Sequence, residues 1–177
     1  MKNALNFNLK KEIRSELAEM VKIDQKMRSV GFSDEENWKK VKEIDLQNTK
    51  KLKVIISKIG WPTISKVGKT ASHNSWLIAQ HADRDKDFQK YCLALMKKEP
   101  AKEIFLDDVA YLEDRLRVSD GKYQLYGTQF YINKKGDYGP RPIKDKRNLN
   151  KRRKAVGLPP MESYHRMMMK RSMVKNN

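Results

Sequence analysis

The stretch "GWPTISKVGKTASHNSWLIAQHADRDKDFQ", residues 60–89, decides how this chain folds. Gly60 is typical of a helix C-terminus, and Trp61 must be extended because a proline follows it, so we expect residues 60–70 to connect two helices. From Ala71 to Lys98 the spacing of apolar residues predicts one long helix. His81 falls on the stripe that this helix must bury.

Helical periodicity extends to most of the chain on either side. It predicts helices over 9–28, 33–59, 106–118 and 145–156, with Ser33 and Glu36 as a capping box and Trp38 on an apolar face. Aromatic and β-branched residues around "NKKGD" predict a hairpin. We therefore expect a mainly α fold: a single helical domain of four to six helices over 1–160, with a small β-hairpin near 123–143. A basic, methionine-rich tail follows over 161–177.

Composition narrows the class of protein. The 177 residues suit one domain, and Cys92, the single cysteine, is expected to be a buried core residue in a reducing compartment. The sequence has no signal-peptide pattern at its start and no stretch of about 20 apolar residues, which a membrane span requires. The expected location is therefore the cytoplasm, without membrane insertion.

The net charge of +17 is concentrated near the C-terminus. Residues 134–177 contain 14 Lys and Arg against 3 Asp and Glu. Such a surface suits an anionic polymer, but lysines outnumber arginines 28 to 11, which is also what codon bias would produce. A solvated charged face is the simpler interpretation.

Polar residues interrupt the apolar stripes of three predicted helices. The interruptions are Asp24 with Arg28, Asp45 with Asn48, and His81 with Gln80 beside it. Buried polar groups must be paired, so these residues are expected to meet each other or a ligand. A closed structural network and a functional site both remain open.

The chemistry of this set points to proton transfer. His81 with Asp24, Asp45 or Asp114 would act as a general base and its orienting carboxylate. A divalent metal is only weakly supported, because the sequence has no His-Glu-x-x-His motif and no paired cysteines. "VGKT" is not a P-loop, since Thr63 stands where that motif needs glycine.

The segment "YGTQ", residues 126–129, crowds hydroxyl and amide groups beside a glycine. A glycine here would let the backbone approach a ligand closely, or would form a bulge in an ordinary hairpin.

Six motifs in order, "ELAEMVKIDQKMR", "GWPTISKVG", "WLIAQHAD", "AYLEDRL", "QLYGTQ" and "KRRKAVGLPPMESY", resemble a bacterial domain-of-unknown-function family. The resemblance spans roughly residues 16–164 and implies that the polar residues in these motifs belong together. It implies no activity. The motif positions are Asp24, Gln25, Arg28, Trp61, Pro62, Gln80, His81, Asp83, Asp114, Arg115, Gln124, Tyr126, Gly127, Thr128 and Gln129.

The preferred hypothesis is an enzyme or small-ligand-binding domain for an anionic or polar ligand, with its cofactor unknown. His81, Asp24 and Asp114 would be catalytic, and the ligand would be bound by Gln25, Arg28, Asp45, Asn48, Gln80, Asp83, Arg115, Gln124, Tyr126, Thr128 and Gln129.

Two interaction hypotheses are the alternatives. A nucleic-acid-binding module would use Lys144, Lys146, Arg147, Lys151, Arg152, Arg153 and Lys154. A protein-interaction module, such as an antitoxin or immunity-like partner, would use "HRMMMKRSM" as an adaptable contact surface.

Overall fold

The computed structural model describes residues 6–29 and 35–175, and the chain divides into two compact units, Met1–Phe105 and Leu106–Asn177. The mainly α fold with a small hairpin is confirmed. The helix count was too low: within the described residues there are eight α-helices, not four to six.

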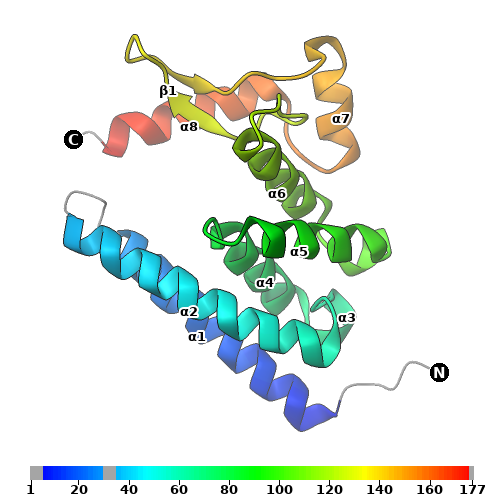
Figure 1. Cartoon of the computed structure of the whole chain (residues 1–177). Helices are drawn as coiled ribbons and strands as arrows, with labels where there is room; N and C mark the ends of the chain where they lie inside the picture. Colours follow the sequence, from blue (N-terminus) through cyan, green and yellow to red (C-terminus); the bar gives the residue numbers. More distant parts are fainter. Residues whose placement is uncertain (1–5, 30–34, 176–177) are drawn as a thin grey trace. The chain divides into compact units, whose positions relative to one another are not determined.

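The regular structure of the N-terminal unit, within residues 6–29 and 35–105, is helical. Its elements are α1 (Phe7–Ser29), α2 (Glu35–Ile59), α3 (Ile64–Val67), α4 (Lys69–His81), α5 (Lys86–Lys98) and a short 3-10 turn (Ala101–Glu103). The two long helices α1 and α2 lie side by side, and α4 packs against both (Figure 1). Their contact faces bury the apolar stripes of the sequence, including Leu17, Met20, Leu52 and Ile78.

The single helix predicted from Ala71 to Lys98 is wrong. The helix ends at His81, and a new one begins at Lys86, because Asp85 caps α5 by accepting a hydrogen bond of 3.0 Å from the Phe88 N–H. The buried Gln89 side chain then donates to the carbonyl oxygens of Ala79 and Gln80. Residues 83–87, "DRDKD", contain no apolar residue, but the spacing of the apolar residues on either side fits one helix, which is why periodicity alone missed the break.

Two smaller expectations changed, and a third is untested. The predicted loop 60–70 contains the one-turn helix α3, although Gly60 does end the preceding helix with a φ of 67°. Trp38 is 42% exposed rather than on a buried face, and Lys42 lies over its ring. Ser33 of the predicted capping box lies outside the described residues.

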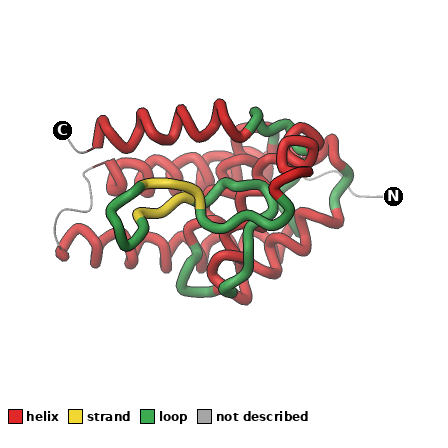
Figure 2. The backbone as a smooth tube through the Cα atoms, turned by 90° about the horizontal axis from the view of Figure 1, so that it is seen from above, coloured by secondary structure: helices red, strands yellow, loops and turns green. Residues whose placement is uncertain are grey.

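The C-terminal unit combines helices with the hairpin. It contains α6 (Leu106–Ser119), β1 (Phe130–Ile132), β2 (Tyr138–Pro140), a 3-10 turn (Lys146–Asn148), α7 (Leu149–Ala155) and α8 (Met161–Lys175). The antiparallel strands pair Tyr131 with Gly139, and they are the short yellow segments in Figure 2. Asn133 builds the turn, because its side-chain oxygen accepts from the N–H groups of Lys135 and Asp137.

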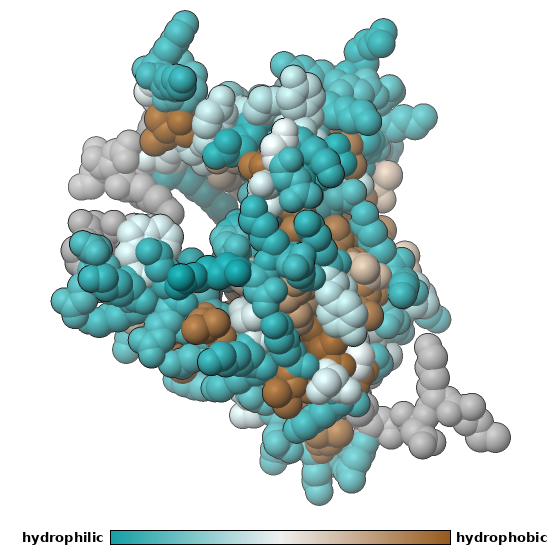
Figure 3. Space-filling model, viewed as in Figure 1, coloured by the Kyte–Doolittle hydropathy of each residue, from teal (hydrophilic) through white to brown (hydrophobic). Residues whose placement is uncertain are grey.

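The face of the molecule drawn in Figure 3 is largely hydrophilic. In the face shown in Figure 3, apolar residues form small separate patches among charged ones. No helix in 6–29 or 35–175 is long and apolar enough to cross a membrane. Cys92 is fully buried as expected, and its burial raises the pKa of the thiol. It is therefore a core residue rather than a reactive thiol.

Candidate functional site

The predicted polar residues of the N-terminal unit meet around one buried carboxylate, Asp24 on α1, which is 1% exposed. Its Oδ1 accepts from Nδ1 of His81 and from Nε of Arg28, both at 3.0 Å. Its Oδ2 accepts from the Gln25 amide at 2.7 Å. Asp24 and Arg28 share a helix face because they are four residues apart, and His81 arrives as the last residue of α4.

The charge of Asp24 decides which nitrogen of His81 holds the proton. Burial alone would raise the pKa of Asp24, but hydrogen bonding and charge from His81, then from Arg28, lower it below its ordinary value. An ionised carboxylate only accepts, so Nδ1 of His81 must donate. In the neutral ring the lone pair is therefore on Nε2, which makes no hydrogen bond to any described residue.

Arg28 connects this carboxylate to a second one on α2. One of its terminal nitrogens donates to Asp45, whose pKa is raised because burial outweighs the favourable charge of Arg28. We define the Asp24 cluster as Asp24, Gln25, Arg28, Asp45 and His81. With both carboxylates ionised and His81 neutral, this cluster has a net charge of −1.

Among the described residues, Asp24, Asp45 and His81 are grouped closely enough to hold a metal ion, but a cationic side chain already pairs with both carboxylates. Their ligand atoms lie within 4.8 Å of one another. The Arg28 guanidinium already donates to both carboxylates, so it supplies the positive charge that a cation would bring. We therefore assign no metal to the cluster.

Two other predicted ligand residues of this unit, Asn48 and Asp83, have structural contacts. The buried Asn48 amide donates to the Met20 carbonyl at 3.4 Å and joins α2 to α1. Asp83 accepts from Gln89 at the break after α4. The side-chain oxygen of Gln80 is buried without a partner among the described residues. Gln89 was not predicted, although its spacing from Cys92 and Met96 places it on the buried face of α5.

Asp114 belongs to the C-terminal unit, where it organises the loop of residues 124–129. The fully buried carboxylate accepts from the N–H groups of Leu125, Tyr126 and Thr128 at 2.6–3.1 Å, and from the Thr128 hydroxyl at 3.1 Å. Burial raises the pKa of Asp114, while these four donors act in the opposite direction. Through these contacts Asp114 anchors the loop of residues 124–129. Arg115, its neighbour on α6, is half-buried.

Gln124 closes the same loop from within. Its side-chain oxygen accepts from the Gln129 N–H at 2.9 Å, and its amide donates to the carbonyls of Gln129 and Arg141. The Gln129 amide donates in turn to the Thr128 hydroxyl at 3.1 Å. The polar groups of "QLYGTQ" therefore pair partly with one another and partly with Asp114, Arg141, Arg152 and Arg153.

Gly127 lies close to side chains of the C-terminal unit, and it does not form the hairpin bulge that the sequence suggested as one interpretation. A Cβ there would lie 2.9 Å from Sδ of Met161 and 3.0 Å from Ile143, and its φ is +71°. We expect Gly127→Ala to cost about 2 kcal/mol, of which about half comes from the positive φ. Gly121→Ala is the matched control, because its φ is +70° with no atom within 4 Å. Urea unfolding of both variants gives the comparison, and equal losses would show that the close contacts are harmless.

Two of the seven predicted nucleic-acid-binding residues, Arg152 and Arg153, donate hydrogen bonds to backbone carbonyls of the C-terminal unit. Arg153 is fully buried over the Tyr164 ring, and it donates to the carbonyls of Tyr126 and Pro159. Arg152 donates to the carbonyls of Leu125 and Lys144. Both hold the 124–129 loop. The exposed members are Lys144, Lys146, Arg147, Lys151 and Lys154.

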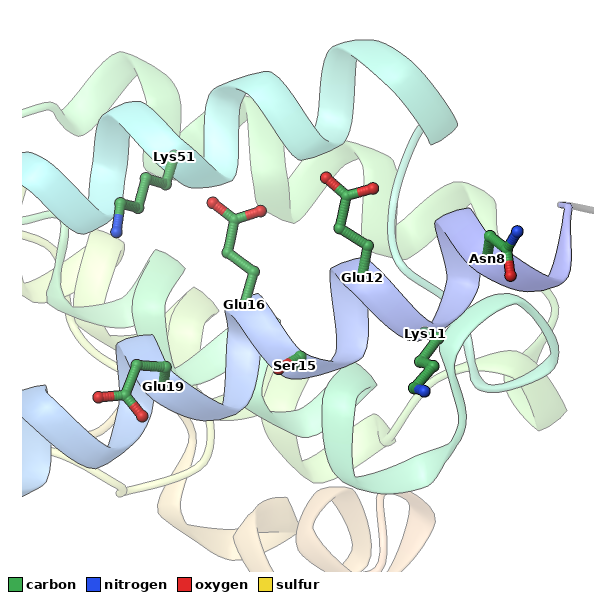
Figure 4. A pocket seen from close by; sticks show the side chains of 7 residues that line it. All are labelled: Asn8, Lys11, Glu12, Ser15, Glu16, Glu19 and Lys51. Atoms are coloured by element: carbon green, nitrogen blue, oxygen red, sulfur yellow. The ribbon is translucent and has the colours of Figure 1, made fainter.

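Two hollows of the N-terminal unit lie outside the Asp24 cluster. One is a groove of about 740 Å³ in which Glu12 and Glu16 of α1 extend toward α2, with Lys51 nearby (Figure 4). The other, of about 330 Å³, lies at the start of α4 and is lined by residues that include Arg14 and Asn74. No residue of the cluster lines either hollow.

The fold and the cluster define a mainly helical protein with a buried carboxylate that orients a histidine. The chain belongs to a family of unknown function, DUF6624, whose model matches residues 9–176. No curated protein and no solved structure matches it.

Proposed function

We propose that the N-terminal unit binds a small polar ligand and acts on it by acid–base chemistry, with His81 as the proton acceptor. The observation that supports this is the 3.0 Å bond between the buried Asp24 and Nδ1 of a ring that keeps 12% of its side chain exposed. A buried carboxylate that fixes the tautomer leaves Nε2 available to a ligand, which is the arrangement a general base needs.

The charge of the cluster limits the ligand class. Sequence alone suggested that Arg28 would hold an anionic group, but its guanidinium is shared between Asp24 and Asp45. At a net charge of −1 an anion would be repelled. The ligand that fits is a neutral proton donor such as an alcohol or water, or a protonated amine.

The test is chemical modification of His81 by diethyl pyrocarbonate, a reagent that acylates a neutral imidazole nitrogen, followed by mass spectrometry. We expect native His81 to react, and the exposed His73 provides an internal reference. Asp24→Asn should slow the reaction at His81 by about tenfold, because the carboxylate no longer fixes the tautomer. Glu19→Gln, an exposed substitution on the same helix, should not change it. A His81 ring that reacts only after unfolding would rule out the proposed function.

A further inference from the structure

The start of α4 has the polar groups of an anion site. Gly68 precedes the helix with a φ of 84° and has no side chain to cap it, and the first described bond into the helix joins the Ser72 N–H to Gly68 O at 3.0 Å. The N–H groups of Lys69, Thr70 and Ala71 therefore make no hydrogen bond to any residue within 6–29 or 35–175. Three such groups at the positive end of a helix favour a bound anion.

Two cationic side chains and no acidic one line this end of the helix. Lys69 is the first helical residue, and the first turn contains no Asp or Glu. Arg14 of α1 is held in place by a 2.6 Å bond from its Nε to the Val67 carbonyl. One of its terminal nitrogens lies 3.1 Å from where a Cβ on Gly68 would be, so glycine allows the guanidinium to reach the helix start.

Asn74 is the independent observation that points to a ligand. It is 9% exposed, and its side chain makes no hydrogen bond to any described residue. It follows Thr70 by one helical turn on the same face, and side chains on a helix lean toward its N-terminus. Its amide is therefore directed toward the 330 Å³ hollow that Arg14, Lys69 and Thr70 also line. A ligand oxygen in this hollow would give the largely buried Asn74 side chain the hydrogen-bond partner that it lacks among the described residues.

We propose that this hollow binds a phosphate group, either as inorganic phosphate or as the phosphomonoester of a small molecule. The backbone N–H groups of residues 69–71, the Arg14 guanidinium, the Lys69 ammonium, the Thr70 hydroxyl and the Asn74 amide provide donors from several directions, which suits a tetrahedral oxyanion. The volume is near the lower limit of small-molecule pockets, about 300 Å³, so the rest of the ligand must be small.

This site differs from the Asp24 cluster and does not depend on it. Lys69 and His81 are the first and last residues of α4, which separates them by about 18 Å at the usual rise of 1.5 Å per residue. The segment "VGKT" lacks the P-loop pattern, and this site does not use a P-loop. Here the additional donors come from α1 and from the second turn of α4.

The experiment is a titration followed by amide NMR, in which sodium phosphate replaces sodium chloride at constant ionic strength. We expect saturable shifts at the backbone amides of Lys69, Thr70 and Ala71 and at the side-chain amide of Asn74. Glycerol 3-phosphate should cause the same shifts, and glycerol none. Absent shifts, or shifts spread over surface lysines of both units, would overturn the proposal.

Variants separate binding from folding. Asn74→Ala should weaken phosphate binding at least about fivefold. Thr70→Glu puts a carboxylate at the start of α4, where a negative charge stabilises the helix. The melting temperature of this variant should therefore not fall, but its phosphate-dependent NMR shifts should disappear. Lys58→Gln, which removes an exposed charge at the end of α2, is the control and should bind as the unchanged protein does. Undiminished phosphate binding by Thr70→Glu would also overturn the proposal.

Discussion

Replacing Asp24 by asparagine is expected to lower the free energy of unfolding of the N-terminal unit by about 3 kcal/mol. Asp24 accepts from His81, Arg28 and Gln25, and an asparagine amide would point hydrogens at some of these donors. Breaking a buried charge pair costs about 3–5 kcal/mol. We expect the lower end of this range because Arg28 still pairs with Asp45 in the variant and its side chain is 20% exposed.

Tryptophan fluorescence during urea unfolding measures this loss, since Trp38, Trp61 and Trp76 all lie in the N-terminal unit. Because the pKa of folded Asp24 is below its ordinary value of 3.8, its contribution is full above pH 3.8. The contribution is lost as pH falls through the folded pKa, so the two proteins should converge there. Glu19→Gln is the control and should cost less than about 1 kcal/mol. A loss that persists unchanged in acid would contradict the assigned charge.

His81→Gln distinguishes the two interpretations of the cluster. A glutamine amide can still donate to Asp24, and the ring is partly exposed, so this variant should lose less than about 1.5 kcal/mol. If it destabilises the unit as much as Asp24→Asn does, His81 is mainly a structural member of the network. A small loss supports a ring that is kept for its chemistry.

Sequence periodicity was sufficient to identify the centre of the candidate site. Asp24 and Asn48 stand where an apolar stripe requires a buried residue, and both are buried. His81 was placed on the same kind of stripe and contacts Asp24. The break after His81 was missed because the spacing of apolar residues resumes at Phe88, although the charged run of residues 83–87, which contains the cap Asp85, interrupts it.

Contacts between distant residues explain the remaining differences. Asp114 was grouped with the catalytic residues because it is a carboxylate in a motif, but its four donors come from a loop 11–14 residues away. Arg153 looked like a surface charge in a basic run, whereas its partner Tyr126 is 27 residues away. Arg14 lies on the polar side of α1 and contacts Val67, 53 residues along the chain. No local pattern encodes such pairings.

Asp114→Asn is expected to destabilise the 124–129 loop by about 3 kcal/mol. Four donors converge on two carboxylate oxygens, and an asparagine offers one oxygen and an amide group that also donates. Depending on which oxygen the amide replaces, the Leu125 N–H or both Thr128 donors are left without an acceptor, at about 1–3 kcal/mol each, and relief from burying a charge offsets only part of this.

Hydrogen exchange at the amides of Leu125, Tyr126 and Thr128 measures this loss directly, because these N–H groups donate to Asp114 and exchange only when the bonds open. A loss of 3 kcal/mol corresponds to an increase in exchange of more than 100-fold. Asp120→Asn, which alters a carboxylate that pairs with Lys122 just beyond α6, should leave the three amides protected. If Asp114→Asn also leaves them protected, the loop is fixed mainly by Gln124, Arg152 and Arg153, and the carboxylate is free for the catalytic role that its motif suggested.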